Sequence, residues 1–279
     1  MDAIAALIEA RFAPEDAREA MEFVKAYYAA GLDELPAGGP RRLAGAALGH
    51  LAFARRRAAG ETLVDVFNPD IDRHGWQSRN SVVMVTTDDR PFLVDSTVAA
   101  LNQMGLALHG LIHPILTVRR DVDGRYLGLS GAGDEAAGPG GRAVPESFML
   151  IEVTRRPDAA ALDQVRRRLV EVLDDVAAAV TGWQAMRDEI DRAIADVESL
   201  PDAVLSEDLR SEHAAFLRWI RDDNFTFLGF QDCRFSEADG QGQRRVEVLR
   251  TLGVMEGTGG DDGRERPRGL ASAPVLQQP

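Results

Sequence analysis

The stretch Asp88-Asp89-Arg90-Pro91-Phe92-Leu93-Val94-Asp95-Ser96 decides the fold, because it joins a strand-like run to a helix-like run. The preceding residues 81–86 are apolar and mostly β-branched, as in a short buried strand. After the stretch, apolar residues recur at helical spacing up to Gly105, which can end a helix. Pro91 suits the first turn of this helix, since its missing N–H would have no partner there. The sequence therefore predicts a strand, an acidic corner and a helix.

This strand-to-helix corner is the candidate binding site of the chain. The N–H groups at a helix N-terminus attract a carboxylate, and an aspartate attracts an ammonium group, so such a corner can hold a small zwitterion. The residues expected to contact an amino-acid effector are Asp88, Asp89, Arg90, Phe92 and Leu93. The alternative is that Asp88 and Asp89 only cap the helix, and the pattern by itself favours capping.

Composition limits the classes of function. The 279 residues are 45% hydrophobic and 28% charged, which is typical of a globular protein with a substantial core. A net charge of −13 argues against nucleic acid or an anionic membrane as a partner, because both require a basic face. The single cysteine, Cys233, excludes an intramolecular disulfide and suits a reducing compartment. The first residues lack the features of a signal peptide, so we expect a cytoplasmic protein.

The order of the expected elements divides the chain into four segments. Residues 1–60 form a helical N-terminal segment, and the arginine run 55–57 is expected at a solvated helix end. Residues 61–180 form an α+β domain. Residues 181–222 are connecting helices, and residues 223–279 open a further unit of strands that is incomplete and ends in an irregular tail.

Within the α+β domain, the expected order from residue 81 is β-α-β-β-β-α, which fits a ferredoxin-like sandwich. An Asp-Gly turn at residues 123–124 predicts a hairpin. The expected strands are 63–67, 81–86, about 106–120, 125–129 and 148–154, and in the last segment 225–230 and 245–250. The expected helices include one that starts at Asp158 and a second that follows Gly182.

Other motifs do not form an active site. Residues 131–136 match the dinucleotide fingerprint G-x-G-x-x-A, but no helix can begin soon enough after them, so we expect a hairpin loop. His109 and His113 lie four residues apart without a nearby carboxylate or cysteine, and a packing or hydrogen-bonding role is favoured over a metal. Cys233 is expected as a small buried residue on a strand, and the three tryptophans as core residues. We expect no catalytic residue, cofactor site or metal site.

Several segments together resemble the N-terminal region of the large bacterial NAD-specific glutamate dehydrogenases. They span roughly residues 61–236 in a consistent order: Val66-Phe-Asn-Pro69 with Gly75-Trp76, the 88–96 stretch, His113-Pro114 and Phe225-Thr-Phe-Leu-Gly229. The resemblance implies ACT-like domains, with a dehydrogenase domain far downstream. It also implies oxidative deamination of L-glutamate to 2-oxoglutarate and ammonia with NAD, in a cytosolic homo-oligomer.

The chain departs from the family pattern in three respects. Arg90 stands where the family usually has methionine, a change that a surface tolerates. Amino-acid-binding ACT domains often have glycine where this chain has Phe92, whose ring would fill ligand space or pack under the sheet. The family's catalytic lysine and Rossmann segments have no counterpart, so we expect a truncated product or an incompletely represented gene that is inactive alone and binds no NAD.

The leading interpretation is the regulatory and assembly N-terminal portion of an NAD-dependent glutamate dehydrogenase. The alternatives are a stand-alone ACT-type amino-acid sensor and a structural module that pairs subunits.

Overall fold

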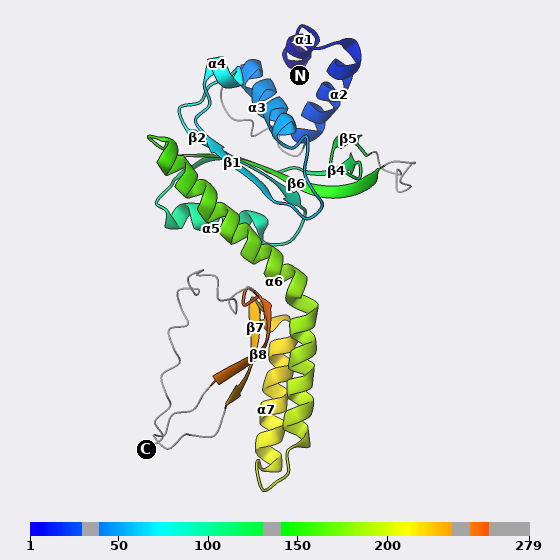
Figure 1. Ribbon diagram of the computed structural model, residues 1–279, viewed down its shortest axis with the longest axis vertical. Helices are drawn as coiled ribbons and strands as arrows, with labels where there is room; N and C mark the ends of the chain where they lie inside the picture. Colours follow the sequence, from blue (N-terminus) through cyan, green and yellow to red (C-terminus); the bar gives the residue numbers. More distant parts are fainter. Residues whose placement is uncertain (30–38, 131–140, 236–245, 257–279) are drawn as a thin grey trace. The chain divides into compact units, whose positions relative to one another are not determined.

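The computed structural model describes residues 1–29, 39–130, 141–235 and 246–256 (Figure 1). Contacts divide the chain into two compact units, Met1–Asp174 and Asp175–Pro279, and each is described here by itself.

The first unit is built on an antiparallel sheet with the strand order β1-β2-β6-β4-β5, in which β3 also pairs with β6. The long strand β6 is central, because β2 pairs along one of its edges while β3 and β4 follow one another along the other edge. The strands are β1 (Leu63–Phe67), β2 (Ser81–Asp88), β3 (Leu108–Ile112), β4 (Ile115–Arg120), β5 (Tyr126–Leu129) and β6 (Arg142–Val153).

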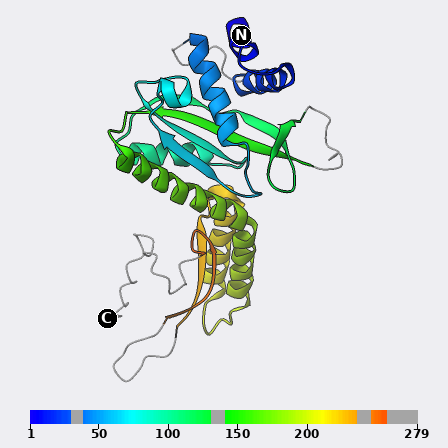
Figure 2. The same cartoon turned by 45° about the horizontal axis from the view of Figure 1, so that its top comes forward.

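Helices cover both faces of this sheet. Figures 1 and 2 show α1–α3 on one face, with α5 and the first part of α6 on the other. Phe148 and Leu150 of β6 belong to the core that the sheet shares with the N-terminal helices. The alternate residues Met149 and Ile151 are also buried, because successive strand side chains point to opposite faces. The helices of this unit are α1 (Asp2–Glu9), α2 (Pro14–Tyr27), α3 (Gly39–Phe53), α4 (Ile71–His74), α5 (Leu93–Gln103) and the start of α6 (Ala159–Ser199).

This arrangement confirms the predicted α+β sandwich. The strand over 63–67, the strand before the corner, the helix after it and the hairpin near residue 123 are all present. Gly105 follows α5 with a φ of +72°, a conformation that suits glycine at a helix end. The N-terminal helices share one core with the sheet. The predicted domain boundaries at residues 60, 180 and 222 stay predictions.

Three details of the sheet differ from the prediction. The single strand expected over 106–120 is two strands, β3 and β4, because His113-Pro114 interrupts it and proline has no N–H to donate. Strand β6 begins at Arg142 rather than Phe148. Helix α5 begins at Leu93, so Pro91 lies before the helix and not in its first turn. Of these three differences, the early start of β6 follows from its pairing with β4, which the local sequence pattern does not show.

The second unit contains the later part of α6, helix α7 (Glu207–Trp219) and an antiparallel hairpin of β7 (Gly229–Phe235) and β8 (Val246–Gly253). The separate helix expected after Gly182 is wrong, because α6 continues through this glycine to Ser199. The strand expected over 225–230 begins later, at Gly229, where its pairing with β8 starts opposite Gly253. That the hairpin opens a second ACT-like unit stays a prediction.

Expected burial fails at several positions in the second unit. Trp76, in the first unit, is a core residue at 2% exposure, but Trp183 and Trp219 are 38% and 49% exposed. Cys233 lies on β7 as expected, yet it is partly exposed.

Within the described residues, no helix combines the length and the apolar character needed to cross a bilayer.

Candidate functional site

The predicted corner lies between the end of β2 and the start of α5. Its backbone is tied to the central strand, because the N–H of Asp89 donates to the carbonyl oxygen of Pro145 at 3.0 Å. Phe92 takes a left-handed conformation with a φ of 70° and is 51% exposed. The phenyl ring is therefore not packed under the sheet. Leu93, at 2% exposure, anchors the first turn of α5 in the core.

Asp88 takes part in an ion cluster rather than in a cap. Its Oδ1 accepts a hydrogen bond from Arg57 Nη2 at 2.7 Å, and its Oδ2 accepts one from Arg90 Nη2 at 3.2 Å. The N-cap residue of α5 is Phe92, and no side chain of a described residue caps the helix. The capping interpretation of Asp88 and Asp89 is therefore wrong. Because Asp88 already has two arginine partners, we infer that it positions the corner instead of contacting a ligand.

The cluster continues inward to Glu146, whose side chain is fully buried. Arg57 Nη2 donates to Glu146 Oε1 at 2.7 Å, and Arg120 donates to both Glu146 oxygens, at 2.5 and 2.8 Å. Burial alone would lower the pKa of Arg57, but the hydrogen bonds and charges of Glu146 and Asp88 raise it above its ordinary value. Arg57 is therefore a permanent cation that holds β2 and β6 together at the corner.

This cluster corrects the expectation for the arginine run. Helix α3 ends at Phe53, so residues 55–57 follow the helix rather than form its solvated end. Arg55 and Arg56 are exposed, but Arg57 is only 1% exposed. Its Nη1 also donates to the carbonyl oxygen of Glu61 at 2.8 Å. A run of like charges is usually solvated, and only the tertiary structure singles out the third arginine.

Glu146 and Arg120 were not among the predicted site residues, although the sequence carries a signal for both. Arg120 is two positions from Val118 on β4, and Glu146 is two positions from Phe148 on β6. Arg120 thus falls among the buried positions of the alternating strand β4, and Glu146 opens the continuously buried part of β6, where an unpaired charge would be very costly. Two opposite charges at buried strand positions predict an ion pair. The strand register places Leu116 opposite Glu146, with Arg120 four residues further along β4.

Asp89 is the exposed acidic group of the corner. It makes no side-chain hydrogen bond or ion pair with another described residue. His113 Nε2 and Ser147 Oγ lie 2.6 Å apart. Burial lowers the pKa of His113, while the charge of Asp89 opposes this shift, so the imidazole is neutral at pH 7. The corner therefore combines an exposed carboxylate with a neutral histidine.

The other candidate motifs contribute nothing to this corner. His109 lies on β3, where its Nε2 is 3.5 Å from Thr154 Oγ1, and it is exposed. Within the parts of the chain that the structure describes, no group of three potential ligands could hold a metal ion. The glycine motif at 131–136 lies outside the described residues.

The arrangement is suited to a small zwitterion. The first N–H groups of α5 have no acceptor within the helix, and no side chain from the described part of the chain caps them, so they can bind a carboxylate. Asp89 can bind an ammonium group. Phe92 and Leu93 mark the start of the helix between these two polar groups.

Residues 23–169 match the family described as "Glutamate dehydrogenase, ACT1 domain". The chain belongs to this family. The matched range contains all six strands of the sheet, the corner and the Arg57–Glu146 cluster. The match confirms the ACT-like fold and the resemblance to the glutamate dehydrogenases.

Three similar proteins are each named NAD-specific glutamate dehydrogenase. The protein of Halomonas elongata is 33% identical over 251 residues, which cover 89% of this ACT1-family chain and 15% of that protein. The protein of Pseudomonas aeruginosa is 33% identical over 75% of this chain and 12% of its own length. The protein of Mycobacterium tuberculosis is 30% identical over 72% of this chain and 12% of its own length. The chain thus spans about 12–15% of the length of these relatives.

Proposed function

We propose that this chain is the N-terminal regulatory and assembly portion of an NAD-dependent glutamate dehydrogenase. In the full-length protein, L-glutamate and NAD would be converted to 2-oxoglutarate and ammonia in the cytoplasm, within a homo-oligomer. NAD would bind to a part of the full-length protein that this chain does not include. The observation that supports this proposal is the ACT1 match over the unit that holds the corner, together with relatives named NAD-specific glutamate dehydrogenase.

The absence of turnover in this chain is tested directly. The purified 279-residue chain is incubated with L-glutamate and NAD, and the absorbance of NADH is followed. We expect no rate above that of a mock purification from cells without the gene. A rate that exceeds this control and scales with the amount of chain would overturn the assignment of catalysis to the rest of the protein.

We further propose that the corner binds an amino-acid effector. Asp89 would bind the ammonium group, the first N–H groups of α5 would bind the carboxylate, and the exposed Phe92 would line the site, while the buried Leu93 would hold the first turn of α5 in place. Asp88 and Arg90 would hold the corner in place, because they are bonded to one another. This division of roles refines the predicted set of five residues.

Calorimetry with a panel of amino acids tests this site. We expect heat of binding for at least one amino acid and a loss of that signal in Asp89→Ala. Asp72→Ala is the matched control, since Asp72 is an exposed aspartate on α4, away from the corner. Silence across the whole panel, or equal losses in both variants, would end the effector proposal.

The alternative is a stand-alone sensor or oligomerisation module of the ACT type. Large apolar side chains that remain exposed on the first unit favour pairing of subunits: Leu7 at 42%, Leu111 at 41% and Ile115 at 54%. Light scattering at tens of micromolar distinguishes the possibilities. A strict monomer there would count against any assembly role.

A further inference from the structure

A polar cavity of about 1040 Å³ lies at the end of the sheet opposite the corner. Its lining comes from the turn after β1, the residues before β2, the start of β3 and the end of β6, with Arg42 from α3. The cavity lies within the first unit and shares no lining residue with the five residues predicted at the corner. It is therefore a second place on this unit where a ligand could bind.

The buried acid of this cavity already has partners. Glu152 on β6 is 5% exposed, and its carboxylate forms an ion pair with Arg42. Ser78 Oγ and Asn80 Nδ2 donate hydrogen bonds to Glu152 Oε2 at 3.2 and 3.1 Å. These contacts compensate the buried charge, so Glu152 holds the wall of the cavity together and does not leave an unpaired acid there.

Two arginines that line the cavity have no acidic partner among the described residues. Arg79 is exposed and makes no hydrogen bond or ion pair with another described residue. Arg155 is also exposed, and its Nη1 donates to a neutral acceptor, the carbonyl oxygen of Ser78, at 3.1 Å. Both guanidinium groups therefore keep charge and donors that a ligand can use.

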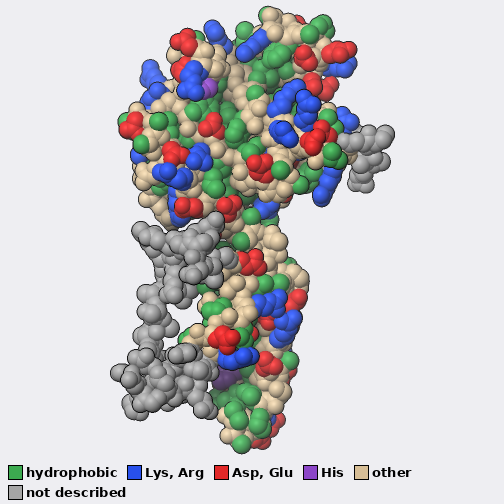
Figure 3. Space-filling model, viewed as in Figure 1, with side chains coloured by type: hydrophobic (Ala, Val, Ile, Leu, Met, Phe, Trp, Pro, Cys, Tyr) green, Lys and Arg blue, Asp and Glu red, His purple; other side chains and the backbone are tan. Residues whose placement is uncertain are grey.

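The other acid of the lining, Asp70, is engaged in a helix cap. It is the N-cap residue of α4, and its Oδ1 accepts a hydrogen bond from the N–H of Arg73 at 2.9 Å. Figure 3 shows basic side chains at the end of the first unit where α4 lies, with acidic ones beside them. The charges without a partner at the cavity are thus basic, although the whole chain has a net charge of −13.

The backbone beside Arg155 is fixed by Asn68, which belongs to the motif at residues 66–69. Asn68 Oδ1 accepts a hydrogen bond from Ser81 Oγ at 2.6 Å, and Asn68 Nδ2 donates to the carbonyl oxygen of Arg156 at 3.0 Å. Ser81 Oγ in turn accepts a hydrogen bond from the N–H of Arg156 at 2.8 Å. These bonds hold Arg155 at the cavity before a ligand arrives, which lowers the entropy cost of binding.

We propose that this cavity binds a small anion with two or more negative charges, whose phosphate or carboxylate groups contact Arg79 and Arg155. A guanidinium group presents paired N–H donors whose geometry matches both kinds of group. The exposed Gln77 and His109 of the lining can add hydrogen bonds. An amino-acid zwitterion fits less well, because both carboxylates of the lining are already bonded and its ammonium group would lack a partner.

Calorimetric titration of the whole 279-residue chain tests the cavity with two probes, pyrophosphate and the dicarboxylate glutarate. We expect heat of binding with at least one of them, and the probe that binds identifies phosphate or carboxylate chemistry. Arg79→Gln and Arg155→Gln should each raise the dissociation constant by about tenfold or more, since each removes a charge-assisted hydrogen bond. Arg79→Gln breaks no hydrogen bond or ion pair among the described residues, so it tests the cavity even if Arg155→Gln proves unstable.

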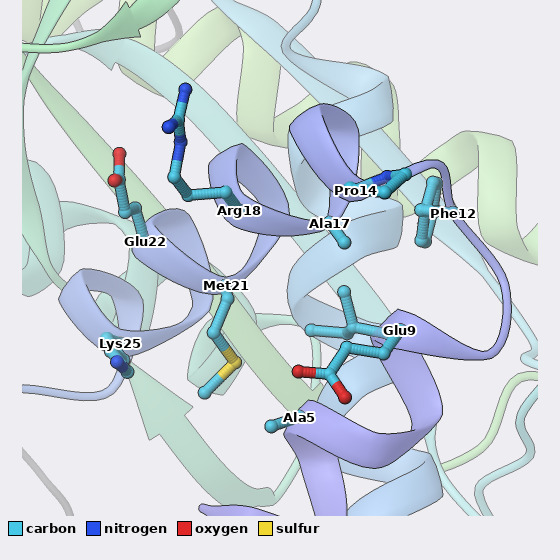
Figure 4. A pocket seen from close by; sticks show the side chains of 10 residues that line it. Ala5, Glu9, Phe12, Pro14, Ala17, Arg18, Met21, Glu22 and Lys25 are labelled. Atoms are coloured by element: carbon cyan, nitrogen blue, oxygen red, sulfur yellow. The ribbon is translucent and has the colours of Figure 1, made fainter.

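The matched control is Arg18→Gln, which removes the same charge from an exposed arginine of α2. Arg18 lines a different groove, between α1 and α2 (Figure 4), where Glu9 and Glu22 balance the charges of Arg18 and Lys25. We expect this variant to bind the probe as the wild type does. Silence with both probes would overturn the proposal. Unchanged binding in Arg79→Gln, or equal weakening in Arg18→Gln, would also overturn it.

Asp89→Ala separates this cavity from the corner. We expect the variant to bind pyrophosphate or glutarate with the wild-type dissociation constant, because Asp89 does not line the cavity. Tighter binding in Asp89→Ala would place the anion at the start of α5, where an acid had opposed it, and would overturn the cavity as the site. The amino-acid titration of Arg79→Gln should match that of the wild type, so either site can fail while the other stands.

Discussion

Removal of the Arg57 side chain should destabilise the first unit more than any change in the rest of the arginine run. In Arg57→Ala, Asp88 and Glu146 each lose a 2.7 Å hydrogen bond to Nη2, and the Glu61 carbonyl loses one at 2.8 Å. Removing one partner of a buried ion pair typically costs about 3–5 kcal/mol. Because Glu146 keeps both hydrogen bonds from Arg120, we expect the lower end of this range, a loss of about 3 kcal/mol.

The control is Arg56→Ala, since Arg56 is the exposed neighbour in the same run. This replacement should lower the free energy of unfolding by no more than about 0.5 kcal/mol. The two compact units can unfold separately, so the probe must report on one of them. In a Trp183→Phe, Trp219→Phe background, the buried Trp76 reports on the first unit alone. Urea unfolding followed by the fluorescence of Trp76 then gives the free energy of unfolding of the first unit. A difference below about 1 kcal/mol between Arg57→Ala and Arg56→Ala would refute the buried cluster.

Three further predictions concern the core and the corner. Burial lowers the pKa of His50 to about 3, so the unfolded chain takes up a proton below pH 6.5 that the folded chain excludes, and stability falls as pH falls from 6.5 toward 3. Between pH 7 and pH 5, the free energy of unfolding should drop by about 2 kcal/mol more in the wild type than in His50→Gln, and equal drops would contradict this. In thermal unfolding, Gly45→Ala should lower the free energy of unfolding by about 2 kcal/mol, because the added Cβ would lie 2.6 Å from Trp76 Cδ1. In Gly49→Ala the added Cβ has no atom closer than 3.8 Å, so helix propensity should raise the free energy of unfolding by up to about 1 kcal/mol. Phe92→Gly should raise the free energy of unfolding, measured in urea, by about 1 kcal/mol, since the φ of Phe92 is 70° and its ring is half exposed. A lower free energy of unfolding in this variant would show that the contacts of the ring outweigh the backbone strain.

The conformation of Phe92 also gives a physical reason for the glycine that amino-acid-binding ACT domains often have at this place. A φ of 70° is inexpensive for glycine and costly for a residue with a Cβ. The backbone of the corner therefore keeps the shape that glycine favours, with a phenyl group added at its surface. The sequence raised the question of this residue, but it could not show that the ring is exposed rather than packed under the sheet.

Much of the fold was predictable, because its elements follow from local pattern. Alternation and β-branching indicated β1 and β2, and helical spacing indicated α5 and the start of α6. The predictions failed where a contact from elsewhere in the chain decided the outcome. Strand β6 extends back to Arg142 because β4 pairs with that part of it, and Pro145 within it accepts the hydrogen bond of Asp89.

The candidate corner was predicted in place but not in chemistry. The sequence located Asp88 and Asp89 between a strand and a helix, which is correct. It treated them as equivalent, whereas the structure bonds Asp88 to two arginines and leaves Asp89 exposed. The partner of Asp88 lies in a run that resembled an ordinary charged helix end.

By itself, the sequence determined the kinds of elements, their order, the acidic balance of the chain and the position of the corner, because hydrophobic period and turn chemistry act within a few residues. Only the tertiary structure decided that Arg57 would meet Glu146, 89 residues away, and that Arg120 would complete the cluster. A buried charge must find a partner wherever the chain path brings one, and that path is a property of the packed sheet and helices rather than of any local stretch.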